Sequence, residues 1–174
     1  MISVIGSGNV DEASPEYEKA RALGRRLVNE GYRVLSGGYG GIMEGASRGA
    51  REAENYREGD VIGVLKGLSR SEGNRYLDIR LSTGFGMARN QIVASSDCVV
   101  AIAGGAGTLS EMAFAWQLGR MLIAYRVPGW SGRLADTKID DKRRIPLDDD
   151  RVYGVETEEE VISLLKERLD LYLH

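Results

Sequence analysis

The stretch that decides the fold of this chain is Val99-Val100-Ala101-Ile102-Ala103-Gly104-Gly105-Ala106-Gly107-Thr108-Leu109-Ser110-Glu111. An apolar run ends in glycines, and apolar residues at helical spacing follow from Met112 to Leu118. This order predicts a strand, a tight turn and the start of a helix. Glycines let the backbone N–H groups of such a turn face outward, and the N-terminus of the following helix carries a partial positive charge. The stretch therefore predicts a binding site for an anion, most naturally a phosphate.

The same stretch allows a structural interpretation of Glu111. Thr108 and Glu111 have the spacing of a capping box, in which a threonine caps a helix and a glutamate three residues later bonds back to it. Thr157 and Glu160 have this spacing too, at a place where the sequence suggests no ligand. The pattern alone therefore leaves Glu111 open as a helix cap or as a reactive group.

Strand and helix patterns alternate along most of the chain. Strands are expected at 2–5, 33–35, 61–65, 77–81, 98–103 and 121–125, and helical patterns separate them. Such alternation predicts a three-layer α/β protein, in which helices cover both faces of a mainly parallel sheet. Residues 151–155 leave room for a seventh strand at the edge, and the length of 174 residues fits a single domain over 1–174.

The pattern fails between Val127 and Asp150. Prolines and glycines interrupt it, and a mixed-charge run follows at 140–144. The simplest expectation is a long solvated surface loop, although loops of this length often serve as lids or subunit contacts.

Composition narrows the class of protein. The chain is 43% hydrophobic and 28% charged, with a formal net charge of −3. Lysines and arginines are interspersed with acids, so attraction to nucleic acid is not expected. We find no apolar run of roughly 20 residues and no signal peptide, so a cytoplasmic protein without a membrane span is expected. The single cysteine, Cys98, excludes an internal disulfide and is expected in the core.

The sequence lacks the motifs of several common nucleotide-binding, catalytic and metal sites. The first turn, Gly6-Ser7-Gly8-Asn9-Val10-Asp11, lacks the third glycine of a dinucleotide motif, and the second strand ends in Ser36-Gly37-Gly38 without an acid. A Walker A pattern is absent as well. The lone histidine, His174, leaves no Ser-His-Asp system and no histidine-based metal cluster, so no metal site is expected.

Three glycine-containing motifs follow the second, fourth and fifth expected strands. They are Ser36-Gly37-Gly38-Tyr39-Gly40-Gly41-Ile42-Met43, Thr83-Gly84-Phe85-Gly86-Met87-Ala88-Arg89-Asn90 and Gly104-Gly105-Ala106-Gly107-Thr108-Leu109-Ser110-Glu111. In this order and spacing they resemble the superfamily that contains the Lonely Guy (LOG) cytokinin-riboside-monophosphate phosphoribohydrolases and the molybdenum cofactor carrier proteins. The resemblance covers roughly residues 1–125.

The resemblance implies a Rossmann-like sheet in the order 3-2-1-4-5-6, with the expected strands counted along the chain. In this order the ligand crevice lies beside Gly6-Ser7-Gly8 and Gly84-Phe85-Gly86, with the turn at 104–107 next to it. The residues expected to hold the ligand are Gly6, Ser7, Gly8, Gly37, Gly38, Gly40, Gly41, Met43, Gly84, Gly86, Asn90, Gly104, Gly105, Gly107 and Thr108.

Two functions follow from the resemblance. The hydrolases typically have proline where this chain has Ala103 and lysine where it has Asn90, so the chain is more similar to the carrier branch. That branch implies binding of a phosphate-bearing nucleotide or nucleotide-like cofactor, such as the molybdenum cofactor or a nucleoside monophosphate. Arg89 and Glu111 match the catalytic pair of the hydrolases. The alternative is therefore hydrolysis of nucleoside 5′-monophosphates to base and ribose 5-phosphate, with no cofactor required for catalysis.

Members of this superfamily are often labelled lysine decarboxylases. That reaction needs an electron sink such as pyridoxal phosphate on a lysine, and the nearest lysine, Lys66, is expected at the far edge of the sheet, away from the crevice. We therefore reject decarboxylation.

The resembled families form dimers or larger assemblies, and the helix at 109–118 is apolar around most of its circumference. A homo-oligomer, dimer or tetramer, is expected.

Overall fold

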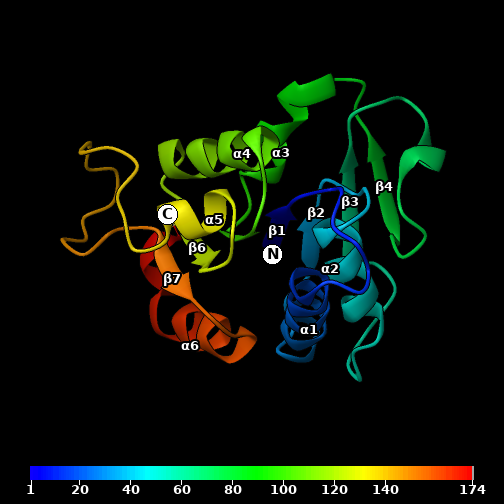
Figure 1. Ribbon diagram of the computed structural model, residues 1–174, viewed down its shortest axis with the longest axis horizontal. Helices are drawn as coiled ribbons and strands as arrows, with labels where there is room; N and C mark the ends of the chain where they lie inside the picture. Colours follow the sequence, from blue (N-terminus) through cyan, green and yellow to red (C-terminus); the bar gives the residue numbers. More distant parts are fainter. Residues whose placement is uncertain (174) are drawn as a thin grey trace.

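The computed structural model describes residues 1–173, so that His174 lies outside the described residues. Within them, one parallel sheet of seven strands runs between two layers of helices (Figure 1). The strands are β1 (Ile2–Gly6), β2 (Val34–Ser36), β3 (Val61–Leu65), β4 (Ile79–Ser82), β5 (Cys98–Ile102), β6 (Met121–Tyr125) and β7 (Tyr153–Val155). The expected α/β fold with a mainly parallel sheet is confirmed, and the seventh strand is present at one edge.

The expected place of one strand is wrong. The sheet order is β4-β3-β2-β1-β5-β6-β7, so β4 lies at the edge beside β3, and β5 occupies the place beside β1. Burial gives the physical reason. Every residue of β5 is buried, as a central parallel strand requires. In β4, polar residues alternate with Ile79 and Leu81, which are 41% and 46% exposed. Such an alternating strand suits an edge.

Helices lie on both faces of the sheet. In Figure 1 the helices α1 (Pro15–Asn29), α2 (Ile42–Arg51) and α6 (Glu158–Arg168) lie below the sheet, whereas α3 (Asn90–Val93) and α4 (Ala106–Gln117) lie above it. Ser14 caps α1, because its side chain accepts a hydrogen bond from the N–H of Tyr17, and Pro15 occupies the first helical position. Short 3₁₀ turns are η1 (Arg70–Glu72), η2 (Gly86–Arg89) and η3 (Leu169–Tyr172).

The segment between β6 and β7 is more ordered at its start than the sequence suggests. The expected loop contains the short helix α5 (Trp130–Leu134), which packs against β5, β6 and α4. The remainder, 135–150, has neither helix nor strand. The apolar side chains of Trp130 and Leu134 explain the helix, since both pack against the buried cluster that includes Met112 and Val99.

The connections of β1 and β5 define where a ligand can enter. The chain leaves β1 toward α1 on one face and leaves β5 toward α4 on the other face. The connections that follow the carboxyl ends of these neighbouring strands therefore run to opposite faces and open a crevice between them, as is general for doubly wound sheets. Cys98 stands at the start of β5 and is fully buried.

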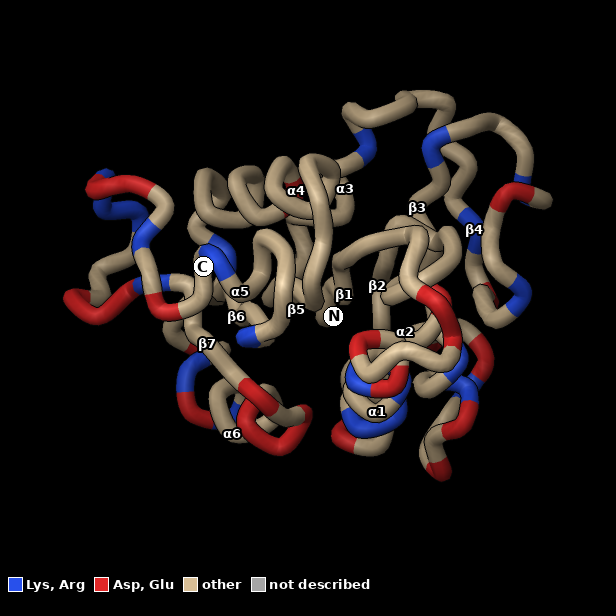
Figure 2. The backbone as a smooth tube through the Cα atoms, in the orientation of Figure 1, with Lys and Arg blue, Asp and Glu red and all other residues tan. Residues whose placement is uncertain are grey.

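Charge is distributed unevenly between the two helix layers. Figure 2 shows charged residues gathered on α1, α2, α6 and the loops, while α3 and α4 are almost free of them. Between Asn90 and Gly119 the charged residues are Asp97 and Glu111. Separately, among residues 1–173 no helix has both the length and the apolar character needed to cross a membrane.

Candidate functional site

A cavity of about 400 Å³ lies at the carboxyl ends of β1 and β5. This volume falls in the range of small-molecule sites in proteins. The lining comes from five separate stretches of the chain, and consists of Gly6, Ser7, Gly8, Asn9, Tyr39, Met43, Lys66, Met87, Arg89, Asn90, Gly105, Gly107, Thr108 and Glu111.

The first turn of α4 faces the cavity with bare backbone. Gly105 is the N-cap residue of this helix, and no side chain in the described part of the chain bonds to the cap. A Cβ built on Gly105 would meet no atom of residues 1–173 within 4 Å, and one on Gly107 would meet the Met87 methyl at 3.8 Å. The first N–H groups of a helix have no partner within the helix and attract anions. The turn is therefore suited to hold a phosphate.

Glu111 does not act as a helix cap. Because α4 begins at Ala106, Thr108 lies inside the helix and not at its N-cap. The carboxylate of Glu111 instead accepts a hydrogen bond from Nη1 of Arg89 at 2.6 Å. At the equally spaced pair near the C-terminus, the Thr157 side chain does cap its helix, by accepting from the N–H of Glu160 at 3.3 Å. The capping alternative for Glu111 is therefore excluded.

The Arg89–Glu111 ion pair is buried beside the cavity, and both side chains are almost inaccessible to solvent. Burial raises the pKa of Glu111 above its ordinary value, and the charge and hydrogen bond of Arg89 oppose this shift. Gly37 provides room for the pair, since a Cβ there would lie 2.4 Å from Nη2 of Arg89. A carboxyl group with a raised pKa next to a fixed cation is the kind of group that moves protons in active sites.

Asn90 connects α3 to the first turns of α4. Its Nδ2 donates to Oγ of Ser110 at 2.7 Å, and Ser110 in turn donates to the carbonyl of Gly107 at 2.7 Å. Because the Ser110 hydroxyl is already used as a donor, it must accept from Asn90, which fixes the orientation of the Asn90 amide. Oδ1 of Asn90 and Nε of Arg89 are buried without a hydrogen-bond partner within residues 1–173. These two unsatisfied groups belong to residues that line the cavity.

The structure brings most of the expected site residues together. The expected residues that line the cavity are Gly6, Ser7, Gly8, Met43, Arg89, Asn90, Gly105, Gly107, Thr108 and Glu111. The expected residues outside its lining are Gly37, Gly38, Gly40, Gly41, Gly84, Gly86 and Gly104.

Protein atoms account for several of these outlying glycines. A Cβ on Gly38 would lie 2.6 Å from Cδ2 of Leu65, and one on Gly104 would lie 2.3 Å from Oγ1 of Thr108. Both glycines have positive φ, 79° and 95°. They therefore shape the turns and do not face the cavity. Gly84 and Gly86 follow β4 at the sheet edge, and the chain reaches the cavity only at Met87.

Sequence reasoning missed Asn9, Tyr39, Lys66 and Met87 as lining residues. The expectation that Lys66 lies away from the crevice is wrong, because β3 is only two places from β1 in the sheet. Its backbone N–H donates to the Tyr39 hydroxyl at 2.8 Å, and its ammonium lies 4.6 Å from the centre of the Tyr39 ring. The rejection of decarboxylation can no longer rest on the distance of Lys66. A usable signal was present, since Lys66 directly follows a strand whose end faces the crevice.

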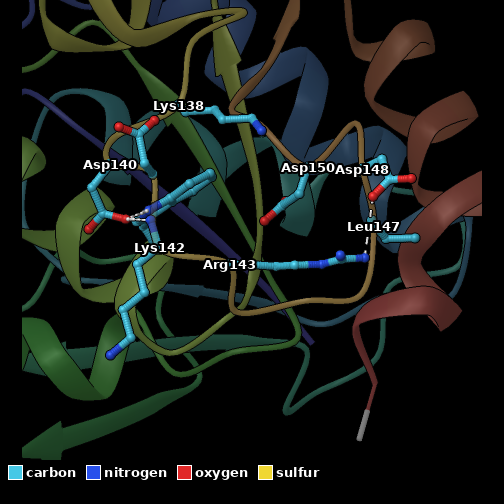
Figure 3. A pocket seen from close by; sticks show the side chains of 9 residues that line it. Lys138, Asp140, Lys142, Arg143, Leu147, Asp148 and Asp150 are labelled. Carbon is cyan, nitrogen blue, oxygen red and sulfur yellow. Dashed lines mark hydrogen bonds and ion pairs between the residues drawn. The ribbon is translucent and has the colours of Figure 1, made fainter.

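A second, smaller cavity of about 110 Å³ lies between Trp116 and the 138–150 segment (Figure 3). Two of the residues beside it, Trp116 and Asp140, are joined by a hydrogen bond. Nε1 of Trp116 donates to Asp140 at 3.1 Å, and Arg144 bonds both carboxylate oxygens of Asp140. These bonds hold the pKa of Asp140 below its ordinary value. In residues 1–173, no group of three His, Cys, Asp or Glu side chains could hold a metal ion.

The fold and the cavity at the carboxyl ends of β1 and β5 define a Rossmann-like α/β protein with a small-molecule cavity where the strand order reverses. The chain belongs to the SLOG cluster4 family, whose family model matches residues 1–161. The resemblance drawn from the glycine motifs is thereby confirmed.

Solved structures extend this family assignment. TM1055 is 31% identical to this chain with a TM-score of 0.80, covering 95% of this chain and 98% of that one. The molybdenum cofactor binding protein from the phototrophic bacterium Rippkaea orientalis is 33% identical with a TM-score of 0.77, covering 95% and 94%. The molybdenum cofactor carrier protein from Chlamydomonas reinhardtii is 30% identical with a TM-score of 0.76, covering 97% and 98%.

A more remote structure shows the fold alone. DNA processing protein A from Helicobacter pylori, described as binding single-stranded DNA, is 17% identical with a TM-score of 0.67, covering 95% of this chain and 80% of that one.

Proposed function

We propose that this protein binds a phosphate-bearing nucleotide or nucleotide-like cofactor in the cavity at the carboxyl ends of β1 and β5, with the molybdenum cofactor or a nucleoside monophosphate as its ligand. The observation that carries the proposal is the N-terminus of α4, where Gly105 presents backbone to open space. A phosphate held there accepts hydrogen bonds from the first-turn N–H groups and from the Thr108 hydroxyl, and gains from the helix dipole.

The remaining lining residues suit the rest of such a ligand. Lys66 and Arg89 supply positive charge, while Met43, Tyr39 and Met87 offer apolar and aromatic surface to a flat ring system. The space that a Cβ would fill at Gly105 fits the phosphate of the molybdenum cofactor as well as that of a nucleotide. The relatives named for molybdenum cofactor binding support this choice. Protein side chains would then hold the organic part of that cofactor.

Calorimetry tests the proposal with AMP, GMP and a phosphorylated pterin as probes. We expect binding by wild type, and loss of binding in Gly105→Val, because the new side chain occupies the phosphate position, and its Cβ meets no atom of residues 1–173 within 4 Å. Gln117→Ala, at the exposed end of the same helix, is the matched control and retains affinity. Failure of all three probes to bind wild type at millimolar concentration would contradict the proposal.

The buried ion pair favours a second function, hydrolysis of nucleoside 5′-monophosphates. Glu111 would stabilise the ribosyl cation that forms as the base departs and would orient the attacking water, while Arg89 holds its carboxylate in place. Incubation with AMP and chromatography for adenine tests this reaction. Adenine release by wild type, absent in Glu111→Gln, would support it, and no release by wild type over hours would favour binding alone.

We also propose that the protein forms homo-oligomers through the α3 and α4 layer, in which Glu111 is the one charged residue of the two helices and is buried. Ile92 in α3 and Leu118, the C-cap residue of α4, are 38% and 41% exposed. Light scattering at micromolar concentration tests this, and a monomer mass would contradict it.

Two further parts of the proposal are a cytoplasmic location, which the lone buried Cys98 supports, and no binding of nucleic acid, which the net charge of −3 supports.

A further inference from the structure

The turn that precedes α4 is held from outside the cavity by residues 129–131. Ser131 is fully buried, and its Oγ accepts a hydrogen bond from the N–H of Ala103 at 2.8 Å. The N–H of Ser131 donates to the carbonyl of Ala103 at 3.1 Å, and the N–H of Trp130 donates to the carbonyl of Gly104 at 3.1 Å. Three hydrogen bonds thus fix the two residues directly before Gly105.

Ala103 needs such support because of its backbone conformation. Its φ is 56°, in the left-handed region that residues other than glycine rarely adopt and keep only where their surroundings enforce it. Gly129 lets the supporting segment lie against the turn, since a Cβ there would be 2.7 Å from the carbonyl carbon of Ala103. The two hydrogen bonds between Ala103 and Ser131, and the one that Trp130 donates to Gly104, are therefore the contacts that keep Ala103 left-handed.

We propose that Ser131 is a positioning residue for the ligand. By holding Ala103 in the left-handed conformation, it aims the backbone N–H groups of the Gly105–Gly107 turn at the cavity. The inference rests on the proposed function, and it gives the start of the segment between β6 and β7 a role in ligand binding. It also predicts which residues suit position 103. Proline does not, because its φ is fixed near −65° and it has no N–H to donate to Ser131.

Affinity measurements on the whole protein provide the first test. Ser131→Ala should bind AMP and inorganic phosphate about five-fold more weakly than wild type, the effect of losing one neutral hydrogen bond. Ala103→Gly keeps both the positive φ and the N–H, so it should bind at least about ten-fold more tightly than Ala103→Pro. Ser96→Ala is the control, because Ser96 is buried at the opposite end of β5 and donates to the carbonyl of Cys98 at 2.8 Å.

Backbone NMR provides a second test that needs no ligand. In Ser131→Ala the amide proton of Ala103 should exchange faster with solvent, and the amide signals of Gly104, Gly105 and Gly107 should shift. Ser96→Ala should leave these signals in place. A variant Ser131→Ala with wild-type affinity, or with unmoved turn signals, would overturn the proposal, even if its melting temperature fell.

The two tests separate this inference from the proposed function. If wild type binds neither AMP nor phosphate, the proposed function fails, and the NMR experiment alone decides whether Ser131 sets the turn. Shifted turn signals in Ser131→Ala would then support the positioning role, and unchanged signals would end it.

Discussion

The turn after β5 and the turn after β2 have similar glycine-rich sequences and opposite surroundings. In the β5 turn, a Cβ on Gly105 would point into open cavity space, with no atom of the described chain within 4 Å. In the β2 turn, a Cβ on Gly37 would lie 2.4 Å from the Arg89 guanidinium, and one on Gly38 would lie 2.6 Å from Leu65. At Gly105 glycine thus leaves space for a ligand, whereas at Gly37 and Gly38, as at Gly104 in the β5 turn, it leaves space for the protein's own side chains. A glycine-rich motif indicates that space beside the backbone is needed, but it does not indicate whether a ligand or another part of the protein fills that space.

The largest expected effect comes from Gly38→Val, which tests the β2 side of this comparison. We expect a loss of about 3 kcal/mol or more in the free energy of unfolding, because overpacking and the positive φ each cost about 1–3 kcal/mol. Urea denaturation measures it. Gly105→Val is the matched substitution in the other turn and should stay within about 1 kcal/mol of wild type. Equal losses in both variants would break the comparison.

An intermediate effect is expected for Gly37→Ala, because its methyl group would displace the Arg89 guanidinium. The free energy of unfolding should fall by about 1–3 kcal/mol. In an Arg89→Met background the same change should cost less, and a double-mutant cycle measures the difference. Gly107→Ala, inside α4 with only an ordinary contact to Met87, serves as the control and should not destabilise the protein. Additive losses from Gly37→Ala and Arg89→Met would contradict this account.

The smallest expected effect concerns the pH dependence of stability, and it tests the ion pair that Gly37 accommodates. Since burial raises the pKa of Glu111, the folded state binds a proton more readily than the unfolded state. The contribution of Glu111 to stability is therefore full below its ordinary pKa of 4.5 and is lost as the pH rises through the higher folded value. We therefore expect the melting temperature of wild type to fall relative to that of Glu111→Gln as the pH rises from about 4 to about 8, and thermal denaturation of both proteins measures this. If the melting temperature of wild type rises relative to that of Glu111→Gln, the attraction of Arg89 for the ionised carboxylate outweighs the effect of burial.

The sequence predicted the helices and strands along the chain better than the order of the strands in the sheet. Alternation of strands and helices was enough for the parallel sheet, because most crossovers between parallel strands contain a helix, although the β3–β4 connection has only the 3₁₀ turn η1. The place of β4 was wrong because the resemblance outweighed a local signal: its polar Arg80 and Ser82 alternate with apolar residues, whereas β5 is apolar throughout. Strand composition reports on burial, and burial distinguishes an edge strand from a central one.

The candidate site was predictable where backbone chemistry decides it and not where long-range packing does. The turn before Glu111 could be recognised from its glycines and the following helix. The same pattern misplaced Gly38, because only the fold shows that Leu65 fills the space beside it. The contact of Ser131 with Ala103 spans 28 residues, and no local pattern reports a bond of that range.

The fully buried Cys98 gives this protein an internal reporter of its own opening. Burial raises the pKa of its thiol, so little reactive thiolate forms while β5 stays in the sheet. A thiol reagent therefore reacts with Cys98 only after local unfolding has exposed β5. Because the chain has one cysteine, the labelling rate reports this unfolding alone. Any compound that binds the closed molecule slows the labelling in proportion to its occupancy. Unknown ligands can thus be ranked by reaction rate in unmodified protein, without knowing beforehand what the cavity holds.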